Sequence, residues 1–305
     1  MKKVLITGAN GLLGQKLVYK LKGNQRYEVY ATGRGKSRLP KEWGDGYHWL
    51  SLDVTDLEQV IHVFDKVKPD FLIHTAAMTH VDECELNQEA CELQNVEAVN
   101  NLNQACEKQR THFIHLSTDF IFSGADGPYD ENAIPDPVNY YGVTKLKSEE
   151  LLRSSSLKWA IARTVLVYGI AADMSRSNII LWVKNSLENG KNIQVVNDQW
   201  RTPTLAEDLA DGCILIMEKE ATGVFNISGK DMLTPYDMAM MTADYFGLDK
   251  SLIQEVDSTI FTQPAKRPLK TGFIIKKAVN ELGYSPKSFT DGIGILSKQI
   301  KLADS

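Results

Sequence analysis

Three glycines near the start of the chain constrain its fold more than any other feature. The spacing Gly8-x-x-Gly11-x-x-Gly14 lies between an apolar run at residues 4–6 and an apolar stripe at helical spacing over residues 13–21. This pattern predicts a buried strand, a tight turn and a helix. Gly8 would permit the turn, Gly11 the close approach of a phosphate, and Gly14 the packing of helix on strand.

Such a turn places backbone N–H groups and the positive end of a helix at one point, which suits a pyrophosphate. We therefore interpret the start of the chain as a dinucleotide-binding unit, with an ordinary structural turn as the alternative. The expected cofactor contacts in this turn are Gly8, Asn10, Gly11, Leu12, Leu13 and Gly14.

Predicted strands and helices alternate through the first half of the chain, with further strands at residues 27–32, 49–54, 71–77 and 113–116 and a long helix at 87–109. This alternation predicts an α/β fold, a Rossmann-type doubly wound parallel sheet. From about Asp173 the pattern loosens, with helices expected at 178–187 and 205–217 and strands at 193–196 and 224–227. We assign residues 1–172 to an NAD(P)-binding domain. Residues 173–305 would form mainly a smaller C-terminal substrate-binding lobe, with a soft boundary because its chain is expected to cross back to the sheet.

The end of the second predicted strand is basic, with Arg34 followed by Lys36 and Arg38. An acidic residue at this place holds the ribose 2′-hydroxyl of NAD, whereas a basic residue suits the 2′-phosphate of NADP. We therefore expect NADPH as cofactor, with NADH as a second cofactor that the protein could accept; a solvated basic loop is the alternative. Further cofactor contacts are expected from the ends of the third and fourth strands, namely Asp53, Val54, Ala76 and Ala77.

Tyr141 and Lys145 lie four residues apart at the start of a predicted helix, so both face the same side. A nearby ammonium lowers the pKa of a phenol from its ordinary value of about 10 and moves it toward a useful acid–base range. The lysine could also bind the cofactor ribose. Thr118, at the end of the fifth predicted strand, could donate its hydroxyl to the same substrate oxygen. We predict that Thr118, Tyr141 and Lys145 are catalytic, with Tyr141 and Lys145 also contacting the cofactor.

These features resemble the dTDP-4-dehydrorhamnose reductase family of the extended short-chain dehydrogenase/reductase superfamily, and the resemblance covers essentially the whole chain. It is strengthened by the stretches at residues 117–122, 137–145, 163–169 and 202–210. The resemblance implies NADPH-dependent reduction of the 4-keto group of a dTDP-6-deoxy-hexulose to dTDP-L-rhamnose. It implies that Tyr141 donates the proton, that Lys145 tunes Tyr141 and holds the ribose, and that Thr118 polarises the carbonyl.

The sequence departs from the family pattern at Met78 and Phe120, where a tyrosine is common. Met78 would lie near the cleft, so the identity of the sugar nucleotide stays open. Arginine binds phosphate in a fork, so arginines near the cleft could meet the substrate diphosphate, with an inter-lobe salt bridge as the alternative. The candidate substrate contacts are Thr79, Asp119, Trp200, Arg201 and Arg267.

Two other functions remain open at this point. One is a nucleotide-sugar epimerase or dehydratase of the same superfamily, which keeps NAD bound and returns the hydride; Asp119 beside Thr118 is compatible with it. The basic end of the second strand argues against it. The other is a non-catalytic regulatory subunit that resembles the methionine adenosyltransferase beta subunit. Such a protein does not need the three catalytic residues, so their presence argues against this function.

Composition narrows the classes of partner. The 305 residues carry a formal net charge of -5, which gives no electrostatic support to binding of nucleic acid. The four cysteines include no Cys-x-x-Cys pair, and no apolar stretch is long enough to span a membrane, so we expect a cytoplasmic protein. We assign no metal site to the alternating His80, Asp82 and Cys84, and leave Mg²⁺ dependence open because some members of the family use it. A homodimer is a candidate assembly.

Overall fold

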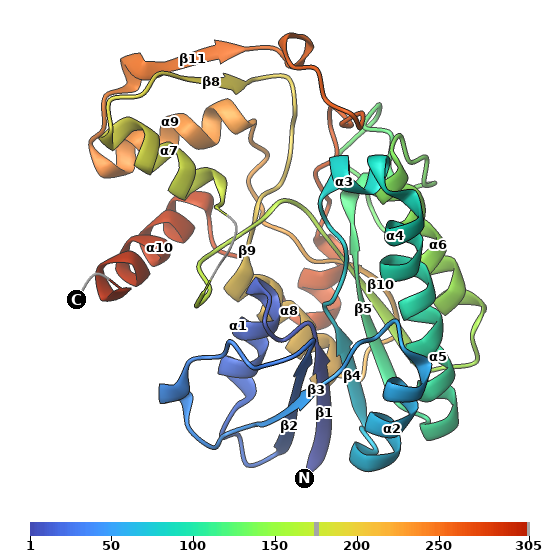
Figure 1. Ribbon diagram of the computed structural model, residues 1–305. Coiled ribbons are helices and arrows are strands. Elements are labelled where there is room, and N and C mark those ends of the chain that lie inside the picture. The colour runs from blue at the N-terminus through green and yellow to red at the C-terminus, as the bar shows by residue number, and fades with distance from the viewer. Residues whose placement is uncertain (174–176, 304–305) are drawn as a thin grey trace.

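A seven-stranded parallel sheet forms the centre of the molecule (Figure 1). The computed structural model describes residues 1–173 and 177–303. The strands are β1 (Lys2–Thr7), β2 (Tyr27–Gly33), β3 (His48–Ser51), β4 (Phe71–His74), β5 (His112–Thr118), β6 (Trp159–Thr164) and β10 (Gly223–Asn226). Their order in the sheet, β10-β6-β5-β4-β1-β2-β3, confirms the predicted doubly wound sheet. All strands are parallel, and the order in which the chain adds strands to the sheet reverses between β1 and β4. Ligands of such sheets bind at this reversal, beyond the carboxyl ends of the strands.

Helices cover both faces of the sheet (Figure 1). Val4 and Ile6 pack with α1 (Leu12–Leu21) and α8 (Ala206–Glu218) on one face. Leu5 packs on the opposite face with α2 (Leu57–Val67), α5 (Ala98–Gln109) and α6 (Tyr140–Ser154), as expected from the alternation of side chains along a strand. Because both faces are buried, β1 and β4 carry continuous apolar runs at residues 4–6 and 71–73.

A smaller lobe lies beyond the carboxyl ends of the strands (Figure 1). It contains α7 (Ile179–Glu188), α9 (Pro235–Phe246), α10 (Phe289–Ala303) and the parallel pair β8 (Ile193–Val196) and β11 (Ile253–Val256), with apolar clusters of their own. The short strands β7 (Val167–Tyr168) and β9 (Thr204–Leu205) pair at its base. Between these parts the chain returns to the sheet through α8 and β10, and β10 pairs with β6.

The structure corrects the predicted bounds near the carboxyl ends of the strands. The strand predicted to reach residue 77 ends at His74, and the strand predicted to reach residue 54 ends at Ser51, so the residues after them lie in loops. The helix predicted at 87–109 is divided into α4 (Gln88–Glu92), a π-helix (Leu93–Glu97) and α5, and α3 (Val81–Leu86) precedes it. π-helical turns often occur at functional sites, and this one faces α6.

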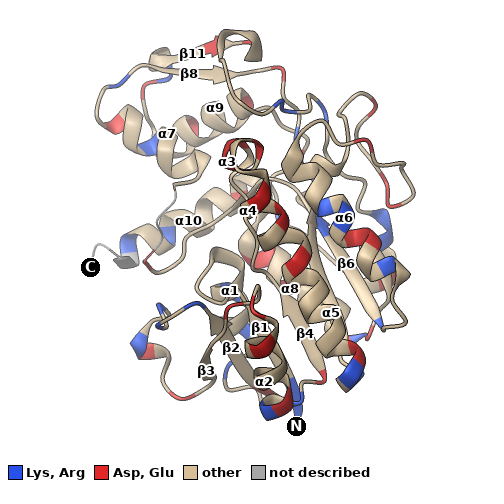
Figure 2. Ribbon diagram, turned by 45° about the vertical axis from the view of Figure 1, so that its right-hand side comes forward, with Lys and Arg blue, Asp and Glu red and all other residues tan. Residues whose placement is uncertain are grey.

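Basic and acidic residues are interspersed over both the sheet region and the smaller lobe (Figure 2). Among the helices of the described residues, none combines the length and the apolar character that crossing a membrane requires.

Candidate active site

The glycine-rich turn forms as the spacing predicts. Gly8 has φ +69°, and a Cβ atom built on it would lie 2.6 Å from the backbone nitrogen of Ala76, so a larger residue would be both strained and obstructed. A Cβ on Gly14 would collide with the carbonyl of Gly8, which shows that α1 packs directly on the turn. The N–H of Gly11 donates to the Gly8 carbonyl over 2.8 Å. The turn therefore sits at the amino end of α1, where an anion is favoured.

A pocket of about 430 Å³ opens between this turn and the loops that follow β2, β3 and β4. Eight of the predicted cofactor residues line it, namely Gly8, Asn10, Gly11, Arg34, Asp53, Val54, Ala76 and Ala77. The other predicted cofactor residues, Leu12, Leu13, Gly14, Tyr141 and Lys145, are not among its lining residues. Gly33, Leu52, Thr75 and Gln94 line it as well, although the sequence pattern did not select them.

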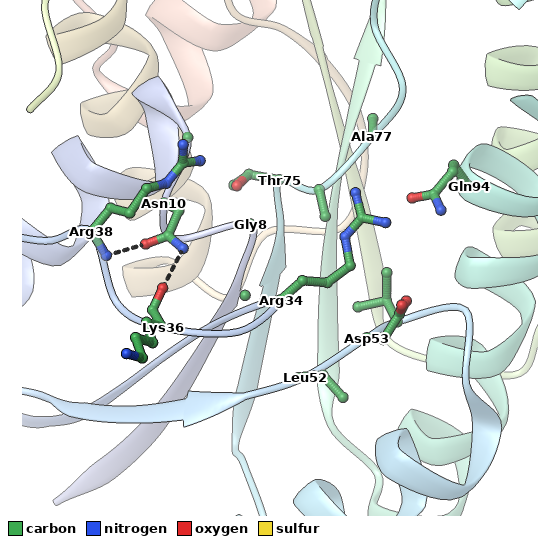
Figure 3. A pocket seen from close by; sticks show the side chains of 14 residues that line it. Gly8, Asn10, Arg34, Lys36, Arg38, Leu52, Asp53, Thr75, Ala77 and Gln94 are labelled. Carbon is green, nitrogen blue, oxygen red and sulfur yellow. Dashed lines mark hydrogen bonds between the residues drawn. The ribbon is translucent and has the colours of Figure 1, made fainter. Parts of the chain in front are cut away.

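Cations gather at one end of this pocket (Figure 3). Arg34, Lys36 and Arg38 are exposed, and within the described part of the chain none of them forms an ion pair. Asn10 fixes their loop, because its side-chain amide donates to the Lys36 carbonyl over 3.1 Å and its oxygen accepts from the Arg38 N–H over 2.8 Å. Figure 3 shows Arg34 extending over the pocket toward Asp53. Unneutralised cations beside a phosphate-binding turn suit a further anionic group.

The beginning of α6 brings Tyr141 to the end of β5. Asn139 caps this helix by accepting from the Gly142 N–H over 2.9 Å. A Cβ on Gly142 would collide with the carbonyl of Phe120, so glycine allows the helix to approach the turn after β5. As a result the hydroxyl of Thr118 lies close enough to the phenol of Tyr141 to affect its pKa. Two of the three predicted catalytic residues therefore meet.

The charge environment of Tyr141 differs from the prediction. Burial is the main cause that raises the pKa of this phenol above its ordinary value, and the carboxylate of Asp119 raises it further. The neighbouring hydroxyl of Thr118 lowers the pKa by more than Asp119 raises it, but by less than burial does. The ammonium of Lys145 points to His115, with 3.1 Å between Nζ and Nε2. The prediction that Lys145 brings down the pKa of Tyr141 is therefore wrong for the structure described here, because burial dominates. A phenol in this environment holds its proton at neutral pH.

Asp119 and Arg201 lie in the contact between the sheet and the smaller lobe. Asp119 is buried, its Oδ1 accepts from the Thr118 hydroxyl over 3.1 Å, and its Oδ2 accepts from the Thr271 hydroxyl. The Nε of Arg201 lies 3.7 Å from the same Oδ2. The other donors of Arg201 bind the carbonyls of Trp200, Pro268 and Leu269 at 2.6–3.0 Å. In the structure Arg201 thus forms an ion pair between the lobe and the sheet, which was the alternative to binding of the substrate diphosphate.

The remaining predicted substrate residues, Trp200, Thr79 and Arg267, lie in separate loops near the carboxyl ends of the strands. Trp200 is 39% exposed, and Thr79 is exposed in the loop between β4 and α3. Arg267 binds both carboxylate oxygens of Asp82 on α3, with 2.8 Å between Nη2 and Oδ2. This pairing is the main cause that holds the pKa of Asp82 below its ordinary value. Arg267 also lines a second pocket, of about 250 Å³, in the smaller lobe. In residues 1–173 and 177–303 no three His, Cys, Asp or Glu side chains lie close enough to hold a metal ion.

The sequence analysis missed Asn95, which connects two parts of the site. Asn95 is buried in the π-helix, and its side chain binds both backbone groups of Met78, at 2.9 Å and 3.0 Å. It also donates to the hydroxyl of Thr144 on α6 over 3.1 Å. A single asparagine at an inward-facing position of an apolar helix pattern was the only signal in the sequence. Its contacts hold the loop after β4 against the helix that carries Tyr141.

Comparison with known proteins identifies the family. Residues 1–301 match the family described as RmlD substrate binding domain. The chain belongs to the dTDP-4-dehydrorhamnose reductase family. A dTDP-4-dehydrorhamnose reductase of Aggregatibacter actinomycetemcomitans is 30% identical, over 95% of this chain and 96% of that protein. The solved structure of a dTDP-4-dehydrorhamnose reductase from Clostridium acetobutylicum is 27% identical, with a TM-score of 0.86 over 98% of this chain and 99% of the other.

Other relatives widen the range of activities. A probable low-salt glycan biosynthesis reductase, Agl14, of Haloferax volcanii is 32% identical over 95% of this chain and 96% of its own. Methionine adenosyltransferase 2 subunit beta of Rattus norvegicus is 31% identical over 88% of this chain and 78% of that protein. The dTDP-4-dehydrorhamnose reductase of Bacillus anthracis, solved in complex with NADP, is 26% identical, with a TM-score of 0.85 over 98% of this chain and 100% of the other. The reductase relatives support an oxidoreductase that uses a nicotinamide cofactor.

Proposed function

We propose that this protein is a dTDP-4-dehydrorhamnose reductase, which uses NADPH to reduce the 4-keto group of a dTDP-6-deoxy-hexulose and forms dTDP-L-rhamnose. The observation that carries this proposal is that α6 packs on the turn after β5 and brings the phenol of Tyr141 beside Thr118. The pair lies on the same edge of the sheet as the glycine-rich turn of the pocket. Cofactor and sugar would then meet at this edge.

In this mechanism the bound nicotinamide supplies the hydride that adds to the carbonyl carbon. With the sugar bound, Thr118 would turn its hydroxyl proton from Asp119 to the carbonyl oxygen and stabilise the negative charge that develops there. Tyr141 transfers its proton to that oxygen, so the ketone becomes an alcohol and the phenol becomes a phenolate. Lys145 holds the ribose of the cofactor. Solvent returns the proton to Tyr141 after the product leaves.

The charge environment of Tyr141 supports reduction over the alternatives. An epimerase or a dehydratase first oxidises the sugar, so its tyrosine must accept a proton, whereas a reductase needs a tyrosine that still carries one. Burial raises the pKa of the Tyr141 phenol, which favours the protonated form that a reductase uses. A dehydratase also uses an acidic residue beside the threonine, and here the carboxylate of Asp119 is already engaged by Thr271 and Arg201.

Three cations that form no ion pair within the described residues support the choice of NADPH. Arg34, Lys36 and Arg38 follow β2, where the adenine ribose of a dinucleotide lies in this type of fold. A 2′-phosphate would give these side chains an anionic partner, and a 2′-hydroxyl would not. Asp53 remains available for the adenine amino group through one oxygen, because its Oδ1 already accepts from Thr55.

A second candidate is a non-catalytic regulatory subunit. It is favoured by the 31% identity to methionine adenosyltransferase 2 subunit beta, which is close to the identity with the reductases. The presence of Thr118, Tyr141 and Lys145 favours the reductase, since a binding subunit has no need for a proton donor beside a carbonyl-polarising hydroxyl.

The test is a turnover experiment with enzymatically prepared dTDP-4-keto-6-deoxy-L-lyxo-hexulose. NADPH and NADH are supplied in parallel, each with added Mg²⁺ and with a chelator, and cofactor oxidation is followed while the sugar product is identified by NMR. The proposal predicts oxidation of NADPH with formation of dTDP-L-rhamnose. Cofactor binding without turnover of this sugar or of other nucleotide-activated 4-keto sugars would instead support the non-catalytic subunit.

A further inference from the structure

A buried polar cluster lies behind the catalytic tyrosine, between β5 and α6. Its members are Lys145, His115 and Ser148, which are 3%, 1% and 0% exposed. The Nε2 atom of His115 is 3.1 Å from the Nζ of Lys145 and 3.1 Å from the hydroxyl of Ser148. One imidazole nitrogen thus meets both side chains, although neither the glycine motif nor the Tyr-x-x-x-Lys motif includes a histidine.

The available protons decide what this nitrogen does. The hydroxyl proton of Ser148 can be donated either to the Lys145 carbonyl, 2.7 Å away, or to Nε2 of His115, 3.1 Å away, and in both cases Nε2 stays free to accept. An ammonium has donors only, so a charged Lys145 requires Nε2 of His115 as an acceptor. The second ring nitrogen, Nδ1, is buried and has no hydrogen-bond partner among the described residues. The contact with Lys145 is therefore made through Nε2 alone.

The surrounding charges keep the imidazole neutral and therefore able to accept. Burial lowers the pKa of His115 well below its ordinary value, and the charge of Lys145 and the neighbouring His74 lower it further. For Lys145, burial lowers the pKa to about 8, against the opposing effects of Glu149, one turn along α6, and of Cys91 on α4. A neutral acceptor beside Lys145 helps the amine to keep its charge at neutral pH despite its burial.

We propose that His115 is a positioning residue, whose Nε2 holds the ammonium of Lys145 where it meets the ribose of the nicotinamide cofactor. This inference rests on the proposed function only in that Lys145 contacts the bound cofactor; it is independent of which sugar is reduced.

The test measures the dissociation constant of NADPH across neutral and alkaline pH, with no sugar present. In His115→Gln the amide reaches the place of Nε2, whereas in His115→Asn it reaches only the place of the partnerless Nδ1; His115→Leu removes both. The matched control is His112→Leu, because His112 is also buried in β5 but its ring packs against Phe71. Thermal unfolding of each variant shows whether it is folded.

The wild-type protein should lose affinity for NADPH as the pH rises through about 8, where Lys145 loses its charge. At neutral pH, His115→Leu and His115→Asn should bind about tenfold more weakly, since a hydrogen bond to a charged group is lost. Their loss of affinity should also begin at lower pH, because the ammonium has lost its acceptor. His115→Gln and His112→Leu should keep the wild-type profile.

Two results would overturn the inference. One is a His115→Leu protein that is folded and keeps the wild-type affinity and pH profile. The other is equal behaviour of His115→Gln and His115→Asn, which would show that His115 only fills space. Failure of the proposed reaction is separate, since it would appear as normal NADPH binding and a normal effect of His115 without turnover of any 4-keto sugar.

Discussion

The cofactor pocket and the contact between sheet and lobe both place an arginine beside the site, but the two arginines do different things. Arg34 is exposed and free of ion pairs within the described residues. Arg201 is 5% exposed, and its guanidinium binds three carbonyls while its Nε faces Asp119. An arginine near a site is available to an anionic ligand only when its donors are not already used within the protein.

The energetics of the two arginines differ for the same reason. The charge of Arg34 stays in water, so its removal leaves no buried group without a partner. The charge of Arg201 has been removed from water and is compensated by Asp119, so its removal would leave a buried carboxylate without a counter-charge, held only by the hydroxyls of Thr118 and Thr271. Variants at these positions can therefore separate binding from stability.

The largest change in stability is expected for Arg201→Ala. The variant should lose about 3–5 kcal/mol of the free energy of unfolding, because one partner of a buried ion pair is removed. Urea denaturation measures this loss. The matched variant Arg34→Ala should stay within about 0.5 kcal/mol of wild type, as surface substitutions do. Similar stability of the two variants would show that Arg201 is not a structural residue.

Thr118→Val should have the next largest effect, on turnover. The variant loses the hydroxyl that meets both Tyr141 and the substrate carbonyl, so kcat should fall about 10²–10³-fold. Thr118→Ser keeps the hydroxyl and should retain most of the activity. Steady-state kinetics of the three proteins decide the matter, and a Val variant as active as the Ser variant would remove Thr118 from the mechanism.

Arg34→Ala should weaken the binding of NADPH more than the binding of NADH. Without this cation the 2′-phosphate loses a partner, so the dissociation constant of NADPH should rise about tenfold while that of NADH changes little. Titration calorimetry with both cofactors measures the two constants. If both cofactors lose affinity equally, the basic loop does not recognise the 2′-phosphate.

Arg267→Ala should have the smallest effect. Its ion pair with Asp82 is partly exposed, so at neutral pH the loss of stability should be at most about 1 kcal/mol. Because the pair holds the pKa of Asp82 below its ordinary value, its contribution is present above the unfolded pKa of about 3.9 and disappears as the pH falls through the lower folded value. Urea denaturation of wild type and variant should therefore converge in acid. A gap that persists in acid would mean that Arg267 acts through packing.

The parts of the molecule that the sequence predicts well are local. The turn from Gly8 to Gly14 is specified by residues that are neighbours in the chain. The other predicted residues of the pocket each directly follow a strand that the apolar pattern predicts. In the structure β10, from the second half of the chain, pairs with β6 in the central sheet.

Contacts between segments that are distant in the chain could not be predicted from the sequence pattern. Asp119 meets Arg201 and Thr271 only after the lobe has folded onto the sheet, and Asn95 is turned toward Met78 by a π-helix that periodicity does not distinguish from an α-helix. The pKa of Tyr141 depends on how deeply α6 is buried, a property of the packed molecule. Sequence could place Tyr141 and Lys145 on one helix face, but not show that Lys145 points to a histidine.

The measurement that tests the proposed mechanism most directly compares wild type and Tyr141→Phe in a single turnover of NADPH with the 4-keto sugar. Removal of the phenolic hydroxyl takes away only the proton that is transferred. The rate of NADPH oxidation should fall about 10²–10⁴-fold while the dissociation constant of NADPH stays within about twofold of wild type. A Tyr141→Phe protein that oxidises NADPH at the wild-type rate would contradict the assignment of Tyr141 as the proton donor.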